Sequence, residues 1–529
     1  MVSDLLDFQV GAAGLGIGAF GGLIDALSAC SKIYGLWKSL RGLDGYLGLL
    51  RTKLILQEAL LDQWQSDWLD FPISGRSDIQ KQRILQRHQD AVLASLMTVR
   101  TLLETLEPLR EASGSSDKAL ERLSLAAGGA ADHDKTLTQI STVLNDLYRL
   151  LPTRDPNVVL SQTVLSLEHI DTNAQFISDA KATTPDELGP ESFRRAISFR
   201  QLGHNLEKDL EERVAAFRSN SWGPDLTLRP DRVKVMRDDE VAAGFRSFGT
   251  IDSDMPVIIE WKRYDLTWKG KKGIRLRGRI QNIARLLHAS SKPEELLTLN
   301  CLGVFEDHER SRYGLVFECP LETGGKAKML SLKSLLERPT PETLPTLGNR
   351  YRLAYALTLS LAILHASGWL HKSIRSHNIM FPMKGERPIW SRPYLVGFDF
   401  SRPDSSDETT EKPEHSVRFN IYRHPSAQGI PRESFRKGFD IYSLGVVLVE
   451  VGLWRLAWSL RRDDENPAMF QKVVIGKVKD RLAHFMGTEY QEAALSCLNG
   501  DLEQRNESVI RAFYKEVVET MSSLAESQP

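Results

Sequence analysis

Apolar residues recur at helical spacing through the first 220 residues of the chain, with polar residues at the intervening positions. The clearest stripe runs from about Lys32 to Trp68, where leucines gather on one broad face. Helices are predicted over residues 32–68, 77–106, 136–151, 156–180 and 190–217. No strand-like alternation precedes Asp231. The pattern therefore predicts an all-α bundle over residues 1–220, whose last helix, at about 190–217, braces it against the unit that follows.

A different pattern begins after residues 221–231, a short linker with two prolines and a glycine. Beyond this linker, the segment MPVIIEWKRYD from Met255 to Asp265 has the alternation of a strand. A helical pattern from about Ile274 to His288 interrupts the strands. At 529 residues the chain is too long for one core, so residues 232–525 are predicted to form a second unit that mixes strands and helices.

The N-terminus carries an apolar, glycine-rich segment, residues 8–29, in which Asp25 is the one charged residue. At about 1.5 Å per residue, a helix of this length crosses a hydrocarbon layer of about 30 Å, and the acidic start MVSDLLD disfavours a secretory signal. Gly14, Gly18 and Gly22 form a tandem GxxxG pattern, which makes this face a candidate for membrane insertion and self-association. A buried core helix is the alternative, because a charge such as Asp25 costs about 2.5 to 3.5 kcal/mol inside a bilayer.

Charge and cysteine content narrow the functional classes. The 68 lysines and arginines nearly balance 69 acidic residues, so the chain as a whole has no electrostatic basis for binding nucleic acid. The four cysteines have neither metal-ligand spacing nor the density of a disulfide scaffold; they are Cys30, Cys301, Cys319 and Cys497. Buried free thiols in a reducing, cytoplasmic compartment are therefore predicted.

Short segments of the second unit match the ordered motifs of a protein kinase. HKSIRSHN, from His371 to Asn378, has the spacing of the catalytic HRDxxxxN motif, and GFDFS, from Gly397 to Ser401, lies where DFG is expected. Asp440 and the apolar run after it resemble the start of the large C-lobe helix, and LVFECP, from Leu315 to Pro320, resembles the last N-lobe strand and the hinge. The unit thus resembles the protein-kinase family. This resemblance implies an α+β bilobal fold, with an N-lobe to about residue 317 and a C-lobe from about residue 321.

The same resemblance implies that the catalytic machinery is degenerate. Ser373 stands where kinases place the aspartate that accepts the proton, and a neutral hydroxyl cannot act as a base near neutral pH. Gln281 stands at the position of the helix glutamate, and its amide can hydrogen-bond a lysine without neutralising it. The segment AAGFRSFGT does not match the glycine-loop pattern GxGxxG. The unit is therefore predicted to be a pseudokinase and not an enzyme, with an active atypical kinase as the alternative.

Several nucleotide-contacting positions are nevertheless retained. The resemblance implies nucleotide binding by Lys262, Glu318, Arg375, Asn378 and Asp399, with Asn378 and Asp399 as the metal ligands. An exposed strand lysine is the alternative for Lys262.

Two other residues oppose nucleotide binding. Glu260 lies on the same strand face as Lys262, where its carboxylate would enter the purine slot. Pro320, three residues after Phe317, lacks the N–H that donates to adenine. No cofactor is therefore required, and ATP with Mg²⁺ stays open as a ligand.

Residues 402–418, RPDSSDETTEKPEHSVR, replace the activation loop with a polar, acidic run that is rich in hydroxyl groups. Candidates for phosphorylation by an upstream kinase are Ser405, Ser406, Thr409 and Thr410. A solvated loop without a regulatory role is the alternative.

The order of the parts, an apolar N-terminus, a helical bundle and a kinase-like unit, resembles the fungal HeLo family, whose members permeabilise membranes in incompatibility cell death. The layout is also similar to that of the mixed lineage kinase domain-like necroptosis effectors. The resemblance implies a cytoplasmic effector that responds to an upstream signalling protein, binds plasma-membrane lipids when active and self-associates. A non-catalytic scaffold, with the apolar N-terminus kept in the core, is the alternative.

Overall fold

A computed structural model of the 529-residue chain describes most of the protein. The described residues are 21–39, 45–68, 76–108, 130–151, 191–216, 226–236, 245–252, 255–267, 270–320, 329–404, 417–428, 434–461, 466–504 and 508–527. They belong to two compact units, residues 1–197 and residues 198–529, which we describe separately.

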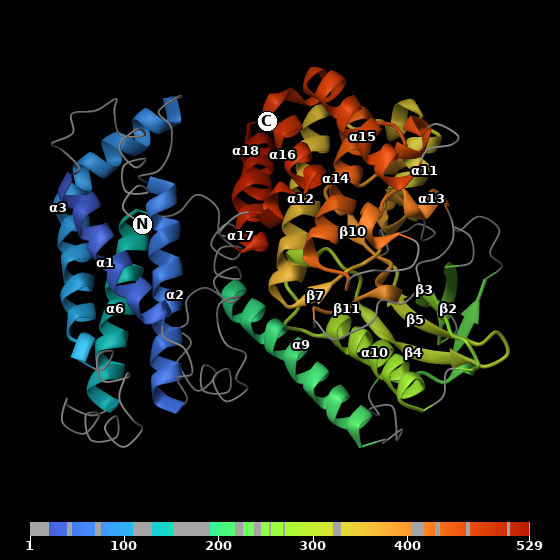
Figure 1. The fold of residues 1–529 in the computed structure, drawn as a ribbon, viewed down its shortest axis with the longest axis horizontal. Coiled ribbons are helices and arrows are strands. Elements are labelled where there is room, and N and C mark those ends of the chain that lie inside the picture. Colours follow the sequence, from blue (N-terminus) through green and yellow to red (C-terminus); the bar gives the residue numbers. More distant parts are fainter. Residues whose placement is uncertain are drawn as a thin grey trace. The chain divides into compact units, whose positions relative to one another are not determined.

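The N-terminal unit contains helices that lie side by side (Figure 1): α1 (Gly21–Ser39), α2 (Gly45–Trp68), α3 (Arg76–Glu104) and α6 (Ala130–Leu150). Their apolar stripes meet in one core, in which Trp37 and Trp64 are fully buried. A buried hydrogen bond connects α2 with α6: the Gln57 amide donates to the Leu137 carbonyl oxygen at 3.1 Å. The predicted helix 32–68 falls on two helices, α1 and α2, and the predicted helix 156–180 lies outside the described residues.

Helix α1 contains the second half of the apolar segment that begins at Phe8. Its apolar face packs on α3 and α2 and includes Leu23, Ala26, Leu27 and Cys30, each at most 2% exposed. Among the helices of the described residues, none combines the length and apolar character that a membrane span requires. Gly22 does not bring helices unusually close, since a Cβ added there would lie 3.8 Å from Leu93. Gly14 and Gly18 lie outside the described residues.

The first part of the C-terminal unit is a five-stranded antiparallel sheet with the order β1-β2-β3-β5-β4. Its strands are β1 (Val233–Val235), β2 (Arg246–Ile251), β3 (Met255–Arg263), β4 (Cys301–Asp307) and β5 (Arg312–Glu318). Helix α10 (Gly270–His288) packs on β4 and β5 and begins four residues before the predicted start at Ile274. Strand β3 is central and is buried at every position from Val257 to Lys262, so both of its faces are covered.

The second part of the unit is rich in helices and lies beside the sheet (Figure 1). Its helices are α11 (Leu332–Glu337), α12 (Leu347–Ala366), α13 (Val417–Asn420), α14 (Lys437–Leu453), α15 (Pro467–Lys477), α16 (Ala483–Asn499), α17 (Val509–Phe513) and α18 (Glu519–Glu526). Short strands complete it: β6 (Met329–Ser331), β8 (Ile379–Lys384), β9 (Arg387–Pro388) and β10 (Tyr394–Leu395) form one small sheet, and β7 (Trp369–Leu370) pairs with β11 (Arg402–Pro403). Helix α14 is buried along almost its whole length, so it is the core element of this part.

The boundary between the two units lies within helix α9 (Glu191–Ala215), earlier in the chain than predicted. From Ser198 onward it belongs to the C-terminal unit, so the boundary does not fall at the predicted linker 221–231. The physical reason is its apolar stripe, in which Phe199, Leu206 and Leu210 are buried, with Leu210 against Gly278 of α10. The end of the predicted linker also joins the sheet, because the Leu228 N–H donates to the Val304 carbonyl oxygen at 2.9 Å.

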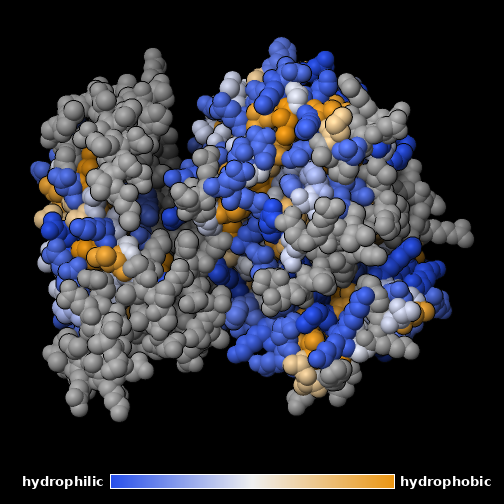
Figure 2. All heavy atoms as spheres, in the orientation of Figure 1, coloured by the Kyte–Doolittle hydropathy of each residue, from blue (hydrophilic) through white to orange (hydrophobic). Residues whose placement is uncertain are grey.

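The described surface is mostly hydrophilic, and hydrophobic residues form small separate patches on the face shown in Figure 2. All four cysteines are free and buried, as predicted.

Candidate functional site

The loop from His371 to Asn378 is fixed by Asp440, a fully buried carboxylate on helix α14. One oxygen of Asp440 accepts the His371 backbone N–H at 2.7 Å, and the other accepts that of Lys372 at 2.8 Å. His365 lies 3.3 Å from the same carboxylate. These bonds satisfy a buried charge and hold Lys372 in the left-handed region, at φ 65°. The loop therefore has one defined conformation, set by the core helix.

The segment from Gly397 to Ser401 packs directly on this loop. The centre of the Phe398 ring lies 4.6 Å from the centre of the His371 ring. Burial lowers the pKa of His371 to about 4. Gly397 has φ 87°, and a Cβ there would lie 2.2 Å from the Asn378 side-chain nitrogen. A glycine is therefore required where the segment crosses Asn378.

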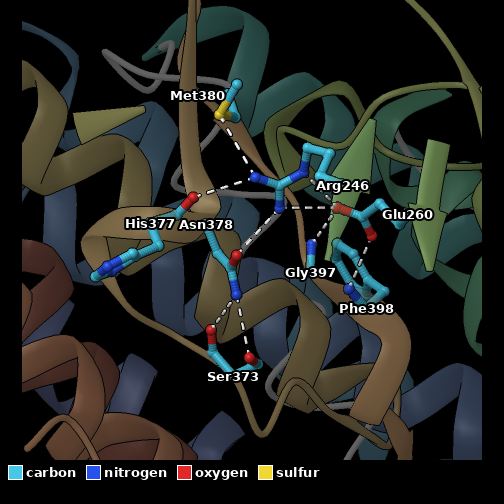
Figure 3. Close-up of polar contacts among 8 residues, drawn as sticks. All are labelled: Arg246, Glu260, Ser373, His377, Asn378, Met380, Gly397 and Phe398. Atoms are coloured by element: carbon cyan, nitrogen blue, oxygen red, sulfur yellow. Dashed lines mark hydrogen bonds and ion pairs between the residues drawn. The ribbon is translucent and has the colours of Figure 1, made fainter. Parts of the chain in front are cut away.

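The Asn378 side chain is bonded at both ends (Figure 3). Its nitrogen donates to the Ser373 carbonyl oxygen at 2.7 Å and to the Ser373 hydroxyl at 3.1 Å. Its oxygen, the atom that a metal ion would need, accepts from Nη2 of Arg246 at 3.1 Å. A positively charged guanidinium thus lies where a cation would bind, so the residues present do not fit Mg²⁺ in this conformation.

Arg246 begins strand β2 and pairs with Glu260 of β3, directly across the hairpin. Its Nη2 lies 3.0 Å from Oε1 of Glu260, and the two side chains are only 4% and 3% exposed. The same guanidinium reaches the helix-rich part through the His377 carbonyl oxygen at 3.3 Å. Figure 3 shows this side chain between the strands and the 371–378 loop.

Glu260 completes the network from the other side. Its Oε1 accepts the Gly397 N–H at 2.7 Å, and its Oε2 accepts the Phe398 N–H at 3.2 Å (Figure 3). The carboxylate predicted to enter the purine slot therefore binds the backbone of the GFDFS segment. Because Arg246 and Glu260 are both buried, these charge-assisted hydrogen bonds connect the sheet to the helix-rich part.

A second contact of the 371–378 loop lies beside the first. The Arg375 guanidinium, predicted to contact phosphate, lies 4.0 Å from the Phe419 ring centre and 5.6 Å from that of Phe245. His377 also packs on Phe419, and burial together with Arg375 lowers its pKa to about 3. Arg375 is thus covered by aromatic rings in this conformation.

The remaining nucleotide candidates lie in different surroundings. Lys262 is 4% exposed and its ammonium lies 3.7 Å from the Phe400 ring centre, so the alternative of an exposed strand lysine is wrong. Gln281 is buried on α10, and Asp399 lines a small cavity between α10 and the 399–402 backbone. Among the described residues, no group of three or more His, Cys, Asp or Glu side chains could hold a metal ion.

The backbone N–H groups of the hinge candidates make hydrogen bonds within the C-terminal unit. Phe317 is 3% exposed, and the Glu318 N–H donates to the Asn300 carbonyl oxygen at 2.9 Å. The next N–H, that of Cys319, donates to the Pro256 carbonyl oxygen at 3.2 Å. Pro320 has no N–H at all. The backbone at Glu318, Cys319 and Pro320 therefore offers no free donor to an adenine ring. The phosphorylation candidates Ser405, Ser406, Thr409 and Thr410 lie outside the described residues.

Sequence reasoning missed Arg246 and a buried network on α14. In that network, Ser376 bonds the Tyr422 hydroxyl at 2.8 Å, and Tyr422 donates to Glu450 at 2.7 Å. Glu450 is fully buried, and burial raises its pKa to about 7. For Arg246 a signal existed, because a buried Glu260 needs a cation and Arg246 faces it across a hairpin. For Glu450, in an apolar helix, no comparable signal is present.

Residues 14–154 match the HeLo family, which is described as "Prion-inhibition and propagation". The N-terminal unit therefore carries a HeLo domain, and this part of the sequence-based resemblance is confirmed. Residues 261–521 match a domain of unknown function, DUF7580. That match covers most of the C-terminal unit, and its description assigns no activity.

Neutralising Glu260 should destabilise the C-terminal unit. Glu260→Gln leaves Arg246 buried without its counter-charge, which costs about 3 to 5 kcal/mol in the free energy of unfolding. The matched carboxylate-to-amide change Asp252→Asn, in the exposed Arg232–Asp252 pair, should have no measurable effect. Urea unfolding of the full chain, followed by hydrogen exchange in β3, measures both. Equal effects of the two variants would contradict the role given to the buried pair.

Glu450→Gln should change how stability depends on pH. Between pH 4.5 and about 7 the unfolded chain releases the Glu450 proton while the folded chain keeps it, so this group loses its contribution to stability as pH rises through that range. The melting temperature of Glu450→Gln minus that of the natural chain should therefore rise from pH 4.5 to about 7 and then stay constant. The exposed Glu492→Gln is the control, and a pH-independent difference for Glu450→Gln would disprove the assignment.

Proposed function

We propose that this protein is a HeLo-domain effector whose C-terminal unit is a pseudokinase that regulates it without transferring phosphate. The proposed outcome is cell death of the incompatibility type, in line with the family that residues 14–154 match. The upstream signal would act on the C-terminal unit, and the HeLo domain would carry out the response.

One observation carries the non-catalytic part of this proposal. The Arg246–Glu260 pair fills the space between the strands and the 371–378 loop and uses the Asn378 oxygen that a metal would need. Ser373, at the position of the base, is bonded to the same asparagine. Phosphoryl transfer needs a carboxylate base and a metal site, and in this conformation Ser373 stands at the position of the base and Arg246 at that of the metal.

The pseudokinase assignment is supported by how the parts are connected. A five-stranded antiparallel sheet with one helix, α10, precedes a helix-rich part, as the resemblance implies. A buried aspartate, Asp440, holds the 371–378 loop, and the Phe398 ring packs on His371. A loop that is bonded from within the fold in this way supports the proposal of a domain used for its conformation.

The membrane part of the proposal rests on helix α1. Its apolar residues Leu23, Ala26 and Leu27 are buried in the bundle, and the apolar sequence continues N-terminally to Phe8. Release of this helix would expose a long apolar surface, for which membrane lipids and further copies of the chain are the proposed partners. The resting protein would be cytoplasmic and would associate with the plasma membrane after activation.

A non-catalytic scaffold is the second candidate. The observation in its favour is that α1 contributes a complete face to the bundle core, from Leu23 to Trp37, which suits a helix that stays in place. In this case both units would bind partners through their surfaces.

The pseudokinase assignment predicts no response to nucleotide. Addition of Mg²⁺ and ATP to the full chain should leave its melting temperature unchanged, because Arg246 and Glu260 occupy the cleft. Radiolabelled phosphate should not be transferred to generic protein substrates, and Asp399→Ala should behave like the natural chain. Magnesium-dependent transfer that Asp399→Ala abolishes would establish the atypical kinase instead.

Liposome leakage separates the effector from the scaffold. An excess of anionic vesicles should capture the minor form of the full chain in which α1 is released, and dye should leak without a further signal. Deletion of residues 1–20 should reduce this leakage to background while leaving every described residue of the bundle in place. Gly14→Leu with Gly18→Leu, which fills the proposed pairing face, should act in the same direction. Leakage that the deletion leaves unchanged, or its absence from the full chain, would favour the scaffold.

A further inference from the structure

Exposed apolar side chains lie together at one end of the helix-rich part, where α12, α14 and α16 meet. Leu344, just before α12, is 49% exposed, Leu347, the first residue of α12, is 40% exposed, and Phe485 of α16 is 49% exposed. The hydroxyl of Tyr351, one turn after Leu347, donates to the carbonyl oxygen of Met486 at 2.9 Å. Leu347 and Phe485 therefore flank one contact between the helices, and Figure 2 shows hydrophobic residues among hydrophilic ones at this end of the unit.

Two half-buried tryptophans lie beside these residues. Trp454 directly follows α14, and its ring centre lies 5.6 Å from that of Trp390, which comes shortly after β9. The guanidinium of Arg350 on α12 lies 5.3 Å from the centre of the Trp454 ring. Tryptophan and arginine are among the residue types that contribute most to the binding energy of protein interfaces. An exposed apolar surface of this composition therefore favours contact with another protein.

Arg350 has no negatively charged partner among the described residues. Its Nη1 donates to the Gly452 carbonyl oxygen at 3.3 Å, and its Nε is buried and makes no hydrogen bond to the described part of the chain. Burial lowers the pKa of Arg350. A carboxylate is the group that best completes such a guanidinium, because it accepts hydrogen bonds at two oxygens.

The backbone presents this surface in one conformation. Gly487 has φ 80° and ψ 163°, so α16 is kinked there and the turn that carries Phe485 is set at an angle to the rest of the helix. A residue with a side chain would strain this backbone. The hydrogen bond of Tyr351 to Met486 holds the same turn against α12. A ligand would therefore not have to order this surface, which lowers the entropic cost of binding.

A second copy of the chain and a lipid bilayer fit this surface less well. A two-fold contact places the same residues on both sides of the interface, so it would bring two Arg350 guanidinium groups together. An anionic bilayer would meet exposed carboxylates at both edges, since Glu342 shortly precedes Leu344 and Glu489 shortly follows Phe485. A protein segment can instead place one carboxylate at Arg350 and apolar side chains on either side of it.

We propose that the surface formed by Leu344, Leu347, Arg350, Trp454 and Phe485, which we call the α12–α16 surface, binds a segment of a partner protein that carries one carboxylate side chain between large apolar residues. The carboxylate pairs with the guanidinium, and the apolar side chains cover the leucines and Phe485. The inference rests on the proposed regulatory role of the C-terminal unit and gives the chemical class of the segment that this unit recognises.

The test is selection of a displayed library of random peptides on the immobilised full chain, followed by fluorescence anisotropy of the selected peptides. These peptides should share an aspartate or glutamate between large apolar residues. Arg350→Gln and Phe485→Ser should each weaken their binding by about tenfold or more. Arg352→Gln on the same helix and Met236→Ser, at another exposed apolar residue, should leave binding unchanged.

A change in the peptide isolates the ion pair without altering the protein. Replacing the peptide carboxylate by the amide should weaken binding to the natural chain by about tenfold. The same replacement should have no further effect on binding to Arg350→Gln, because the two changes remove one shared interaction. A full effect of the amide in Arg350→Gln would show that the carboxylate binds elsewhere and would overturn the pairing.

The other outcomes also decide the proposal. Absence of enriched peptides would overturn it, as would peptides whose binding Arg350→Gln and Phe485→Ser leave unchanged. A dimer of the full chain that Phe485→Ser dissociates in sedimentation would assign the surface to a second copy, and binding of anionic vesicles that Phe485→Ser abolishes would assign it to lipid. Peptide binding through Arg350 that leaves liposome leakage unaltered would support the surface and contradict the regulatory role, so the two proposals fail separately.

Discussion

The C-terminal unit depends on the buried ion pair between Arg246 and Glu260. Two charges removed from water are tolerated only when their remaining donors and acceptors are bonded, and here the partners come from both parts of the unit. The sheet supplies the pair, and the 371–378 loop and the GFDFS segment supply the other bonds. The same contacts therefore close the space between the two parts and fix their relative position.

This constraint explains how residue types that suit a nucleotide site can be present and yet be bonded to one another. Asn378 and Asp399 are the residue types that bind a metal with a nucleotide, yet Asn378 is bonded to Arg246 and Ser373. Arg375 lies over Phe419. A residue's type and spacing in the sequence describe what it can do, whereas its partners in the folded chain determine what it does.

Much of the architecture could be predicted from periodicity. The helical N-terminal region and the strand over Met255–Arg263 follow from local patterns that long-range contacts do not override. The HeLo assignment came instead from the resemblance of the order of the parts to that family, and the match over residues 14–154 confirms it. The domain boundary could not be predicted, because the amphipathic pattern of α9 shows that one face is buried but not which unit buries it. Gly203 and Gly278 decide this, and their meaning depends on Trp369 and Leu210, which are distant in sequence.

The candidate site shows the same limit more sharply. Ser373 and Gln281 are visible in the sequence as departures from the kinase motifs, whereas Arg246 matches no motif and gains its role from pairing across a hairpin. A crystal structure of the full chain grown with Mg²⁺ and a non-hydrolysable ATP analogue tests the central claim most directly. The account predicts the Arg246 guanidinium between Glu260 and Asn378, with no triphosphate beside it. Density for a triphosphate and metal between Asn378 and Asp399, with Arg246 turned away, would contradict it.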